Sequence, residues 1–284
     1  RVINAELDAD VRELEEIVVI GYGTVRKADA TGSVAVVASE DFNKGVISSP
    51  QDLMVGKTAG VVITSNSGAP GSGSTIRIRG GSSLQASNDP LIVIDGVPIE
   101  NEGPSGMSNG LSTINPNDIE SITILKDASA TAIYGSRASN GVMIITTKRG
   151  GNKFKVSYNG NLSLYTVANS LDVLSGDEFR DLVRSKYAAG SAPDTLLGDA
   201  NTDWQSQIYE TAFGHDHNLS VSGTAKAINT PYRLSIGYTN QDGILKTSNY
   251  ERTTLAVGVS PSLLDNHLSI DLNVKAMYNQ NQFA

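Results

Sequence analysis

The sequence predicts an α+β domain of short strands followed by the first strands of an antiparallel transmembrane β-barrel. Three observations lead to this fold class. The 284 residues include 28 glycines, which stand among Ser, Thr and Asn and suit strands joined by turns. The strands are short and apolar before residue 150, but long and strictly alternating after it. No window approaches the run of about 18 apolar residues that a transmembrane helix needs, whereas barrel strands require only alternation.

The first part, residues 26–150, is expected to be one compact domain. We expect its strands at residues 31–37, 60–64, 75–79, 90–94, 119–125 and 142–147. Two of the connections between them, residues 65–74 and 100–110, consist mostly of Gly, Ser, Asn and Pro. Such loops are either plain connectors or sites for a polar ligand such as a sugar or a peptide, and the residues alone leave both open.

Short helices in this domain are indicated by a capping residue followed by proline. This device occurs at residues 49–50, where the helix should end at Gly56, and again at residues 115–116. We expect a third helix with Asp127 as its N-cap and Gly135 as its stop.

The second part alternates apolar and polar residues along each strand. The pattern starts at residues 154–164 and returns at residues 219–221, 232–238, 255–259 and 268–274. In a water-soluble sandwich the two faces would be core and surface. In an outer-membrane barrel they would be lipid and lumen, with tyrosines at the strand ends.

The connections between these strands favour the barrel. Residues 168–216 and 240–249 are long connections, and residues 225–230 and 261–266 are short, so long and short alternate as expected when one end faces the outside. The first long connection should contain a helix that begins with a Ser175-x-x-Glu178 capping box. Five strands cannot close a membrane barrel, so we expect this chain to be part of a longer protein.

Composition and charge exclude several classes of function. The formal net charge is -8 and the 22 basic residues are scattered, so the chain lacks the electrostatic footprint of a nucleic-acid binder. The absence of cysteine removes disulfides, zinc thiolates and thiol nucleophiles.

Two glycine-containing segments resemble nucleotide-binding motifs, but each lacks a glycine that the motif requires. Residues 56–58 read Gly-Lys-Thr like the end of a P-loop, but Gln51 stands where the loop needs glycine. Residues 21–23 read Gly-Tyr-Gly, but Arg26 replaces the third glycine of a dinucleotide fingerprint. We expect no bound cofactor.

Catalytic and metal-binding signals are equally weak. His215 and His217 would share one face of a strand, but no third ligand has a convincing spacing, so we interpret them as exposed loop histidines. No Gly-x-Ser-x-Gly elbow is present, and His267 alone remains to serve a serine. We predict neither an enzyme nor a metal site.

Residues 15–23 (EEIVVIGYG) combine two carboxylates, four β-forming residues and a Gly-x-Gly. Such a short strand cannot bury itself alone and needs a partner edge. It is either an edge strand of the domain that follows or a peptide that another protein captures by strand addition.

Several segments in order resemble the SusC/RagA family of TonB-dependent outer-membrane transporters. They are residues 15–24 (EEIVVIGYGT), 31–34 (TGSV), 75–80 (TIRIRG), 90–98 (PLIVIDGVP), 115–138 (NPNDIESITILKDASATAIYGSRA) and 140–150 (NGVMIITTKRG), with 202–205, 217–223 and 240–246 beyond them. The resemblance covers nearly the whole chain.

The resemblance implies a domain organisation. Residues 1–14 would end an N-terminal β-domain, residues 15–25 would be the Ton box and a linker, and residues 26–150 would be the plug. Residues 151–284 would supply the first five strands of a barrel of about 22 strands, with a long helical extracellular loop at residues 168–216.

It also implies partners and site residues. TonB, with ExbB and ExbD, would bind the Ton box at Glu16, Ile17, Val18, Val19 and Ile20. The plug loops would contact an oligosaccharide or peptide ligand through Asn66, Ser67, Ser72, Asn101, Glu102, Ser108 and Asn109. A SusD-like surface lipoprotein would cover the barrel, which would lie in outer-membrane lipid with its N-terminus in the periplasm.

Two alternatives from other classes of protein remain. One is a soluble secreted β-rich ligand-binding protein, in which the alternating strands form a sandwich. The other is a TonB-linked signalling receptor, in which the region before the Ton box contacts a membrane regulator.

Overall fold

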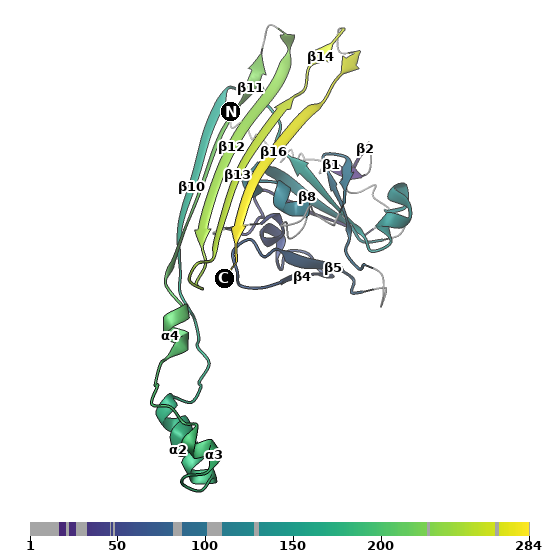
Figure 1. Ribbon diagram of the computed structural model, residues 1–284. Helices are drawn as coiled ribbons and strands as arrows, with labels where there is room; N and C mark the ends of the chain where they lie inside the picture. Colours follow the sequence, from purple (N-terminus) through teal and green to yellow (C-terminus); the bar gives the residue numbers. More distant parts are fainter. Residues whose placement is uncertain are drawn as a thin grey trace, which may run out of the picture.

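The computed structural model describes residues 17–20, 23–26, 33–45, 47, 49–81, 87–100, 110–127, 131–225, 228–264 and 267–283. A compact domain, formed by strands β3 to β9, lies beside a tall sheet of long strands, which we call the wall sheet (Figure 1). The expected N-terminal β-domain at residues 1–14 lies outside the described residues.

The compact domain is built on a five-stranded mixed sheet. Its strands are β3 (Val34–Ala38), β6 (Leu91–Ile94), β7 (Val97–Ile99), β8 (Ile119–Leu125) and β9 (Val142–Thr147), in the order β3-β8-β9-β6-β7. β6 and β9 run parallel, and the other neighbours are antiparallel. β4 (Val61–Ser65) and β5 (Ser74–Ile78) form a separate hairpin.

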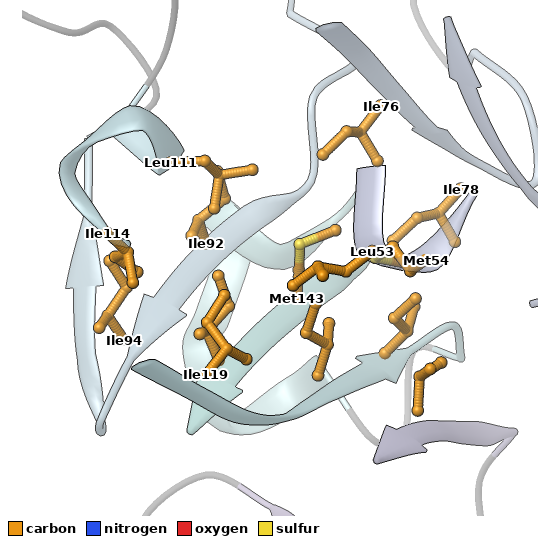
Figure 2. Close-up of a cluster of buried hydrophobic side chains, with 14 residues drawn as sticks. Leu53, Met54, Ile76, Ile78, Ile92, Ile94, Leu111, Ile114, Ile119 and Met143 are labelled. Atoms are coloured by element: carbon orange, nitrogen blue, oxygen red, sulfur yellow. The ribbon is translucent and has the colours of Figure 1, made fainter. Parts of the chain in front are cut away.

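The central strands are apolar along their whole length because both faces of the sheet are covered. In β9, Met143 and Ile145 belong to one buried cluster, whereas Val142 and Ile144 belong to a second cluster. Figure 2 shows the first cluster, in which Leu53 and Leu111 from short helices pack over the sheet. Alternate residues of one strand therefore supply two cores, and this fixes the register of the sheet.

One strand of the domain was not expected. β7 contains Pro98 and has only three residues, so it carries no alternating pattern. It pairs with β6 alone, at the end of the sheet. That position suits a proline, because a strand at the sheet edge needs fewer backbone donors.

The short helices are 3-10 turns: η2 (Pro50–Met54), η3 (Gly110–Thr113), η4 (Pro116–Asp118) and η5 (Ala132–Ala138). The cap-then-proline prediction is confirmed at η2 and η4. At η4 the Asn115 side chain accepts a hydrogen bond of 2.9 Å from the backbone N–H of Asn117.

The third predicted helix is described only in part, because residues 128–130 lie outside the described residues. The backbone N–H of Thr131 donates to the Asp127 carbonyl at 3.1 Å, and Gly135, with φ of 67°, separates two helical pieces within η5, so the predicted glycine stop lies at a helix break. The Asp127 carboxylate instead accepts a 2.6 Å hydrogen bond from the backbone N–H of Ser33 and pairs with Arg79. The Asp127 side chain, which the local sequence assigns to a helix cap, thus forms tertiary contacts with Ser33 and Arg79.

The wall sheet is a five-stranded antiparallel meander. Its strands are β10 (Lys155–Tyr165), β11 (Ala212–Ala225), β12 (Thr230–Asp242), β13 (Asn249–Val259) and β16 (Leu272–Gln282), paired in chain order. The expected strand at residues 268–274 is interrupted. β15 (Leu268–Ser269) pairs with β14 (Ser262–Leu263), and the backbone N–H of Ile270 bonds Pro261 before β16 begins.

The connection from β10 to β11 extends beyond the strand ends and carries α2 (Gly176–Lys186), α3 (Ala192–Thr195) and α4 (Trp204–Ile208) (Figure 1). The predicted capping box is confirmed, since Glu178 N–H donates to Ser175 Oγ at 3.2 Å and Ser175 N–H donates to Glu178 Oε2 at 2.8 Å. These bonds from Ser175 lower the pKa of the Glu178 carboxyl below its ordinary value. None of the described helices is long and apolar enough to cross a membrane.

The two faces of the wall sheet differ in character. The face away from the compact domain is apolar and exposed, with Leu162 at 71% and Leu164 at 73% exposure. It also carries Phe154, Val156, Phe213, Leu219, Leu234, Ile236, Leu255, Leu272 and Val274. A soluble sandwich would cover this face with a second sheet, and no described element does so.

Candidate functional site: the seam between the compact domain and the wall sheet

The inner face of the wall sheet is polar and buried. Its buried side chains include Asp216, Asn218, Ser220, Ser235, Thr239, Arg252 and Thr254. The alternation along each strand puts these residues on one face, and the compact domain covers that face. We call the contact surface the seam.

The most buried ion pair of the seam joins Asp118 of η4 to Arg233 of β12. Arg233 Nη2 lies 2.8 Å from Asp118 Oδ1, and the two side chains are only 12% and 6% exposed. Lys148 lies next to the pair, with its Nζ donating to the Asn117 carbonyl at 2.8 Å. Burial, and then the charge of Arg233, lower the pKa of Lys148 below its ordinary value. Lys148 and Arg233 therefore both lie near the Asp118 carboxylate.

A second ion pair joins Asp95, between β6 and β7, to Lys275 of β16. Asp95 also accepts hydrogen bonds from the backbone N–H of Thr147 at 2.8 Å and from its hydroxyl at 2.7 Å. Burial acts to raise the pKa of Asp95, but the bonds from Lys275 and Thr147 together outweigh it and hold the pKa below its usual value.

Neutral hydrogen bonds complete the seam. Asn115 Nδ2 donates to Thr254 Oγ1 at 3.1 Å, and Asn117 Nδ2 donates to Asp216 Oδ1 at 3.3 Å. Asn115 can approach because its neighbour in the wall is Gly237, where an added Cβ would lie 2.0 Å from Asn115 Nδ2. The glycine in the strand thus marks a close approach of another segment.

The seam contains a small cavity. A cavity of about 30 Å³ lies along it, lined among others by Asp118, Lys148, Arg233 and Lys275. Its lining mixes polar and apolar side chains, in contrast to the two apolar clusters of the compact domain.

At the end of the wall that carries the helices, the β4–β5 loop reaches the strands. Pro70 is buried, and an added Cβ on Gly243 would lie 3.1 Å from it. Gly71 has φ of 70°, and an added Cβ there would lie 2.4 Å from the ring of Tyr250. The loop therefore fits against the wall at the β12–β13 turn.

Comparison with known proteins identifies this arrangement. Residues 26–142 match the TonB-dependent Receptor Plug Domain family. The chain is 54% identical over 284 residues to the TonB-dependent receptor SusC of Bacteroides thetaiotaomicron, covering 99% of this chain and 28% of that protein. It is 42% identical over 274 residues to the TonB-dependent receptor P3 of Formosa agariphila, covering 96% of this chain and 26% of that protein.

A solved structure agrees with these sequence matches. The RagAB peptide importer in its open-open state superposes with a TM-score of 0.80 and 27% identity, over 95% of this chain and 33% of that chain. The chain belongs to the SusC/RagA family of TonB-dependent receptors. The compact domain is the plug of such a receptor, and the wall sheet is part of its barrel. The chain spans between a quarter and a third of these relatives' lengths.

The structure brings three of the predicted ligand residues of this SusC/RagA-family plug onto one loop. Asn66 and Ser67 are exposed, and Ser72 is half-buried. Part of their bonding capacity is used within the loop, because Ser72 Oγ donates to the Ser67 carbonyl at 3.0 Å and Asn66 Oδ1 accepts from Thr75 at 2.8 Å. The other four predicted residues, Asn101, Glu102, Ser108 and Asn109, lie outside the described residues.

The predicted TonB-binding segment is partly described. Residues 17–20 form strand β1 (Ile17–Ile20), which pairs antiparallel with β2 (Gly23–Arg26). Glu16 lies outside the described residues. The role of this segment stays a prediction.

The histidine pair was placed wrongly by sequence. His215 and His217 lie in β11, not in a loop, and are half-buried. They stand on the outer, apolar face of the barrel wall among aromatic side chains. Tyr158 Oη lies 2.8 Å from His217 Nδ1, and the His215 ring lies 5.7 Å from that of Tyr238. In the described part of the chain, no three metal-ligating side chains cluster.

Sequence reasoning also missed the charged residues of the seam. Arg233, Arg252 and Lys275 occupy inward positions of barrel strands, and Arg252 is only 1% exposed, with its guanidinium 5.7 Å from the Tyr250 ring centre. The signal that could have found them is a charge in the polar register of an alternating strand, two residues from Ser235, Thr254 and Asn273 respectively.

Proposed function

We propose that this chain belongs to an active importer of the outer membrane, in which the plug closes the barrel until TonB removes or remodels it. The observation that carries the proposal is the chemistry of the seam. Ion pairs and hydrogen bonds join plug and wall, including Asp118–Arg233, Asp95–Lys275 and Asn115–Thr254. Water can replace such bonds at a small net cost of about 1 kcal/mol each, so a polar seam suits parts that must separate and return.

The cargo we propose is a polymer-derived nutrient, either an oligosaccharide or a peptide. The likeness to the RagAB peptide importer supports a cargo of this size class. The exposed amide and hydroxyl groups of Asn66 and Ser67, on a plug loop at the helix-bearing end of the wall, suit both chemistries. Asn101, Glu102, Ser108 and Asn109 are proposed to act with them.

The partners we propose follow from the same family. TonB, driven through ExbB and ExbD, binds residues 16–20, and a SusD-like lipoprotein covers the barrel. Support for a lid comes from the β10–β11 connection, whose helices expose apolar side chains beyond the strand ends, among them Phe179, Tyr187 and Leu196. The barrel lies in outer-membrane lipid with the N-terminus in the periplasm, and the exposed apolar face of the wall supports this.

Uptake by cells that carry the full-length receptor tests the proposal. Deleting residues 16–20 should abolish accumulation of labelled oligosaccharide or peptide, while binding of the same ligand at the cell surface stays unchanged. Dissipating the proton gradient should have the same effect on the unmodified receptor. Normal uptake after the deletion would contradict the proposal, and comparing the two ligand types identifies the cargo.

A further inference from the structure

The inner face of the wall sheet carries an arginine without a counter-ion in this structure. Arg252 of β13 is 1% exposed, and its guanidinium lies 5.7 Å from the centre of the Tyr250 ring. Its Nε, Nη1 and Nη2 atoms have no hydrogen-bond partner among the described residues. A guanidinium does not lose its proton, and burying a charge without hydrogen bonds is costly. The arrangement therefore leaves unused a group whose preferred partner is a carboxylate.

Arg252 lies close to the plug loop that we propose to contact cargo. This β4–β5 loop carries Asn66 and Ser67, and an added Cβ on its Gly71 would lie 2.4 Å from the Tyr250 ring. Arg252 follows Tyr250 by two residues, so both side chains are on the inner face of β13. Arg252 is therefore next to the part of the wall that the loop covers.

Three further cations lie on the same face. In the register of the wall strands, Lys275 stands level with the residue four positions beyond Arg252, and Arg233 level with the residue six positions beyond it. Lys155 of β10 is in the same cross-strand row as Arg233. At about 3.4 Å per residue, these side chains extend along roughly 20 Å of wall. We call Lys155, Arg233, Arg252 and Lys275 the cationic strip.

The charge of this face differs in sign from that of the chain. The inward positions of the five wall strands hold the cationic strip and one carboxylate, that of Asp216. The 284 residues together have a formal net charge of -8. Charges of one sign on a low-dielectric wall raise the local concentration of molecules of the opposite sign. The inner face of the wall therefore favours anions.

Carboxylates of the plug occupy part of the strip in this structure. Asp118 pairs with Arg233, and Asp95 pairs with Lys275. Any displacement of the plug separates these two carboxylates from the wall and leaves the cations unpaired. Carboxylates that arrive from outside could then take their places.

We propose that the cationic strip selects cargo that carries carboxylate groups, and that Arg252 is the first residue of the strip to bind it. The inference rests on the proposed function, because it takes the inner face of the wall as a lining of the import path. Both proposed cargo classes include such molecules: oligosaccharides that contain uronic acids, and peptides with a C-terminal carboxylate or acidic side chains. A guanidinium binds either kind of carboxylate through two parallel hydrogen bonds.

Thermal stability distinguishes this role from a structural one. Removing an arginine that holds a buried ion pair destabilises a protein, because its partner is left unpaired. Arg252 has no such partner among the described residues. Arg252→Met should therefore leave the thermal stability of the full-length receptor unchanged or raise it. A clear loss of stability would contradict the inference.

Uptake by cells that carry the full-length receptor tests the selection. The labelled probes are a glucose oligosaccharide, a galacturonic acid oligosaccharide of the same length, a glutamate-rich peptide, and the same peptide with glutamine for glutamate and an amidated C-terminus. In one of the two classes, the probe with carboxylates should enter about tenfold faster than its neutral counterpart, as expected for a hydrogen-bonded charge. That class identifies the source of the carboxylate.

Substitutions assign the selection to Arg252. Arg252→Met should slow uptake of the carboxylate probe about tenfold, and Arg252→Lys, which keeps the charge, about threefold. Lys246→Met removes an exposed charge outside the strip and should have no effect.

Equal uptake of charged and neutral probes, or an equal loss of both in Arg252→Met, would overturn the inference and leave the proposed function intact. If the unmodified receptor takes up none of the four probes, the proposed function fails, and the inference fails with it.

Discussion

Replacing Asp118 by Asn should loosen the plug from the barrel wall. The substitution keeps the shape of the side chain and an oxygen that can still accept from Arg233, but it removes the negative charge. Arg233 and Lys148 would then lie close together without the negative charge of residue 118 to offset their positive charges. Because the pair is almost completely buried, water cannot compensate the remaining charges.

The expected size of the effect follows from burial. Breaking a buried ion pair by removing one partner costs about 3 to 5 kcal/mol, and asparagine retains part of the hydrogen bond. We therefore expect about 3 kcal/mol, which corresponds to roughly a hundredfold rise in the population of the opened seam, since about 1.4 kcal/mol is a factor of ten.

Hydrogen exchange of the full-length receptor measures this opening. The backbone N–H of Lys148 donates to the Asp118 carbonyl at 2.8 Å, and that of Asp118 donates to the Asn115 carbonyl at 2.9 Å, so both amides report on the seam. Arg149–Asp271 provides a matched control, because this ion pair also joins plug and wall but is about half exposed. Asp271→Asn should change the exchange by less than about 1 kcal/mol. If Asp118→Asn had no larger effect than Asp271→Asn, the argument from burial would be refuted.

Two further predictions concern other contacts of the plug. Because the folded-state pKa of Asp95 is lowered, its contribution to stability is present above the ordinary pKa and is lost as the pH falls through the lowered value. Lys275→Met should move that loss to higher pH, as an acid titration of receptor stability would detect. Gly71→Ala should destabilise the β4–β5 loop by about 1 kcal/mol for its positive φ, with a further cost for the contact with Tyr250. When Tyr250→Ala is combined with Gly71→Ala, thermal unfolding should recover the cost of the contact but not the cost of the positive φ. Gly68→Ala, whose added Cβ would meet nothing within 4 Å, should be nearly neutral.

The strands were largely predictable because strand signals are local. β8 and β9 have the predicted bounds, since each is a continuous apolar run between turn residues. The five wall strands follow from alternation, which a sheet with one apolar face requires at every second residue. β7 was missed because three residues cannot show a period, and the bond from Asp127 to Ser33 was missed because these residues are 94 positions apart.

The candidate site was predictable only in part. The loop that carries Asn66 and Ser67 was predicted as a loop because its composition differs from the strands around it, and its role in ligand binding stays a prediction. The seam was not found, because its partners are remote in sequence: Asp118 and Arg233 are 115 residues apart, and Asp95 and Lys275 are 180 residues apart. Nothing in the local sequence of either partner specifies the other.

The sequence by itself determined most of the strands, which face of each wall strand is apolar, and the family to which the chain belongs. These properties depend on periodicity and on motifs that lie within a few residues of each other. Only the tertiary structure decided which polar inward residues meet across the seam. This depends on how distant segments are brought together, because the pairing of Asp118 with Arg233 is a property of register and docking.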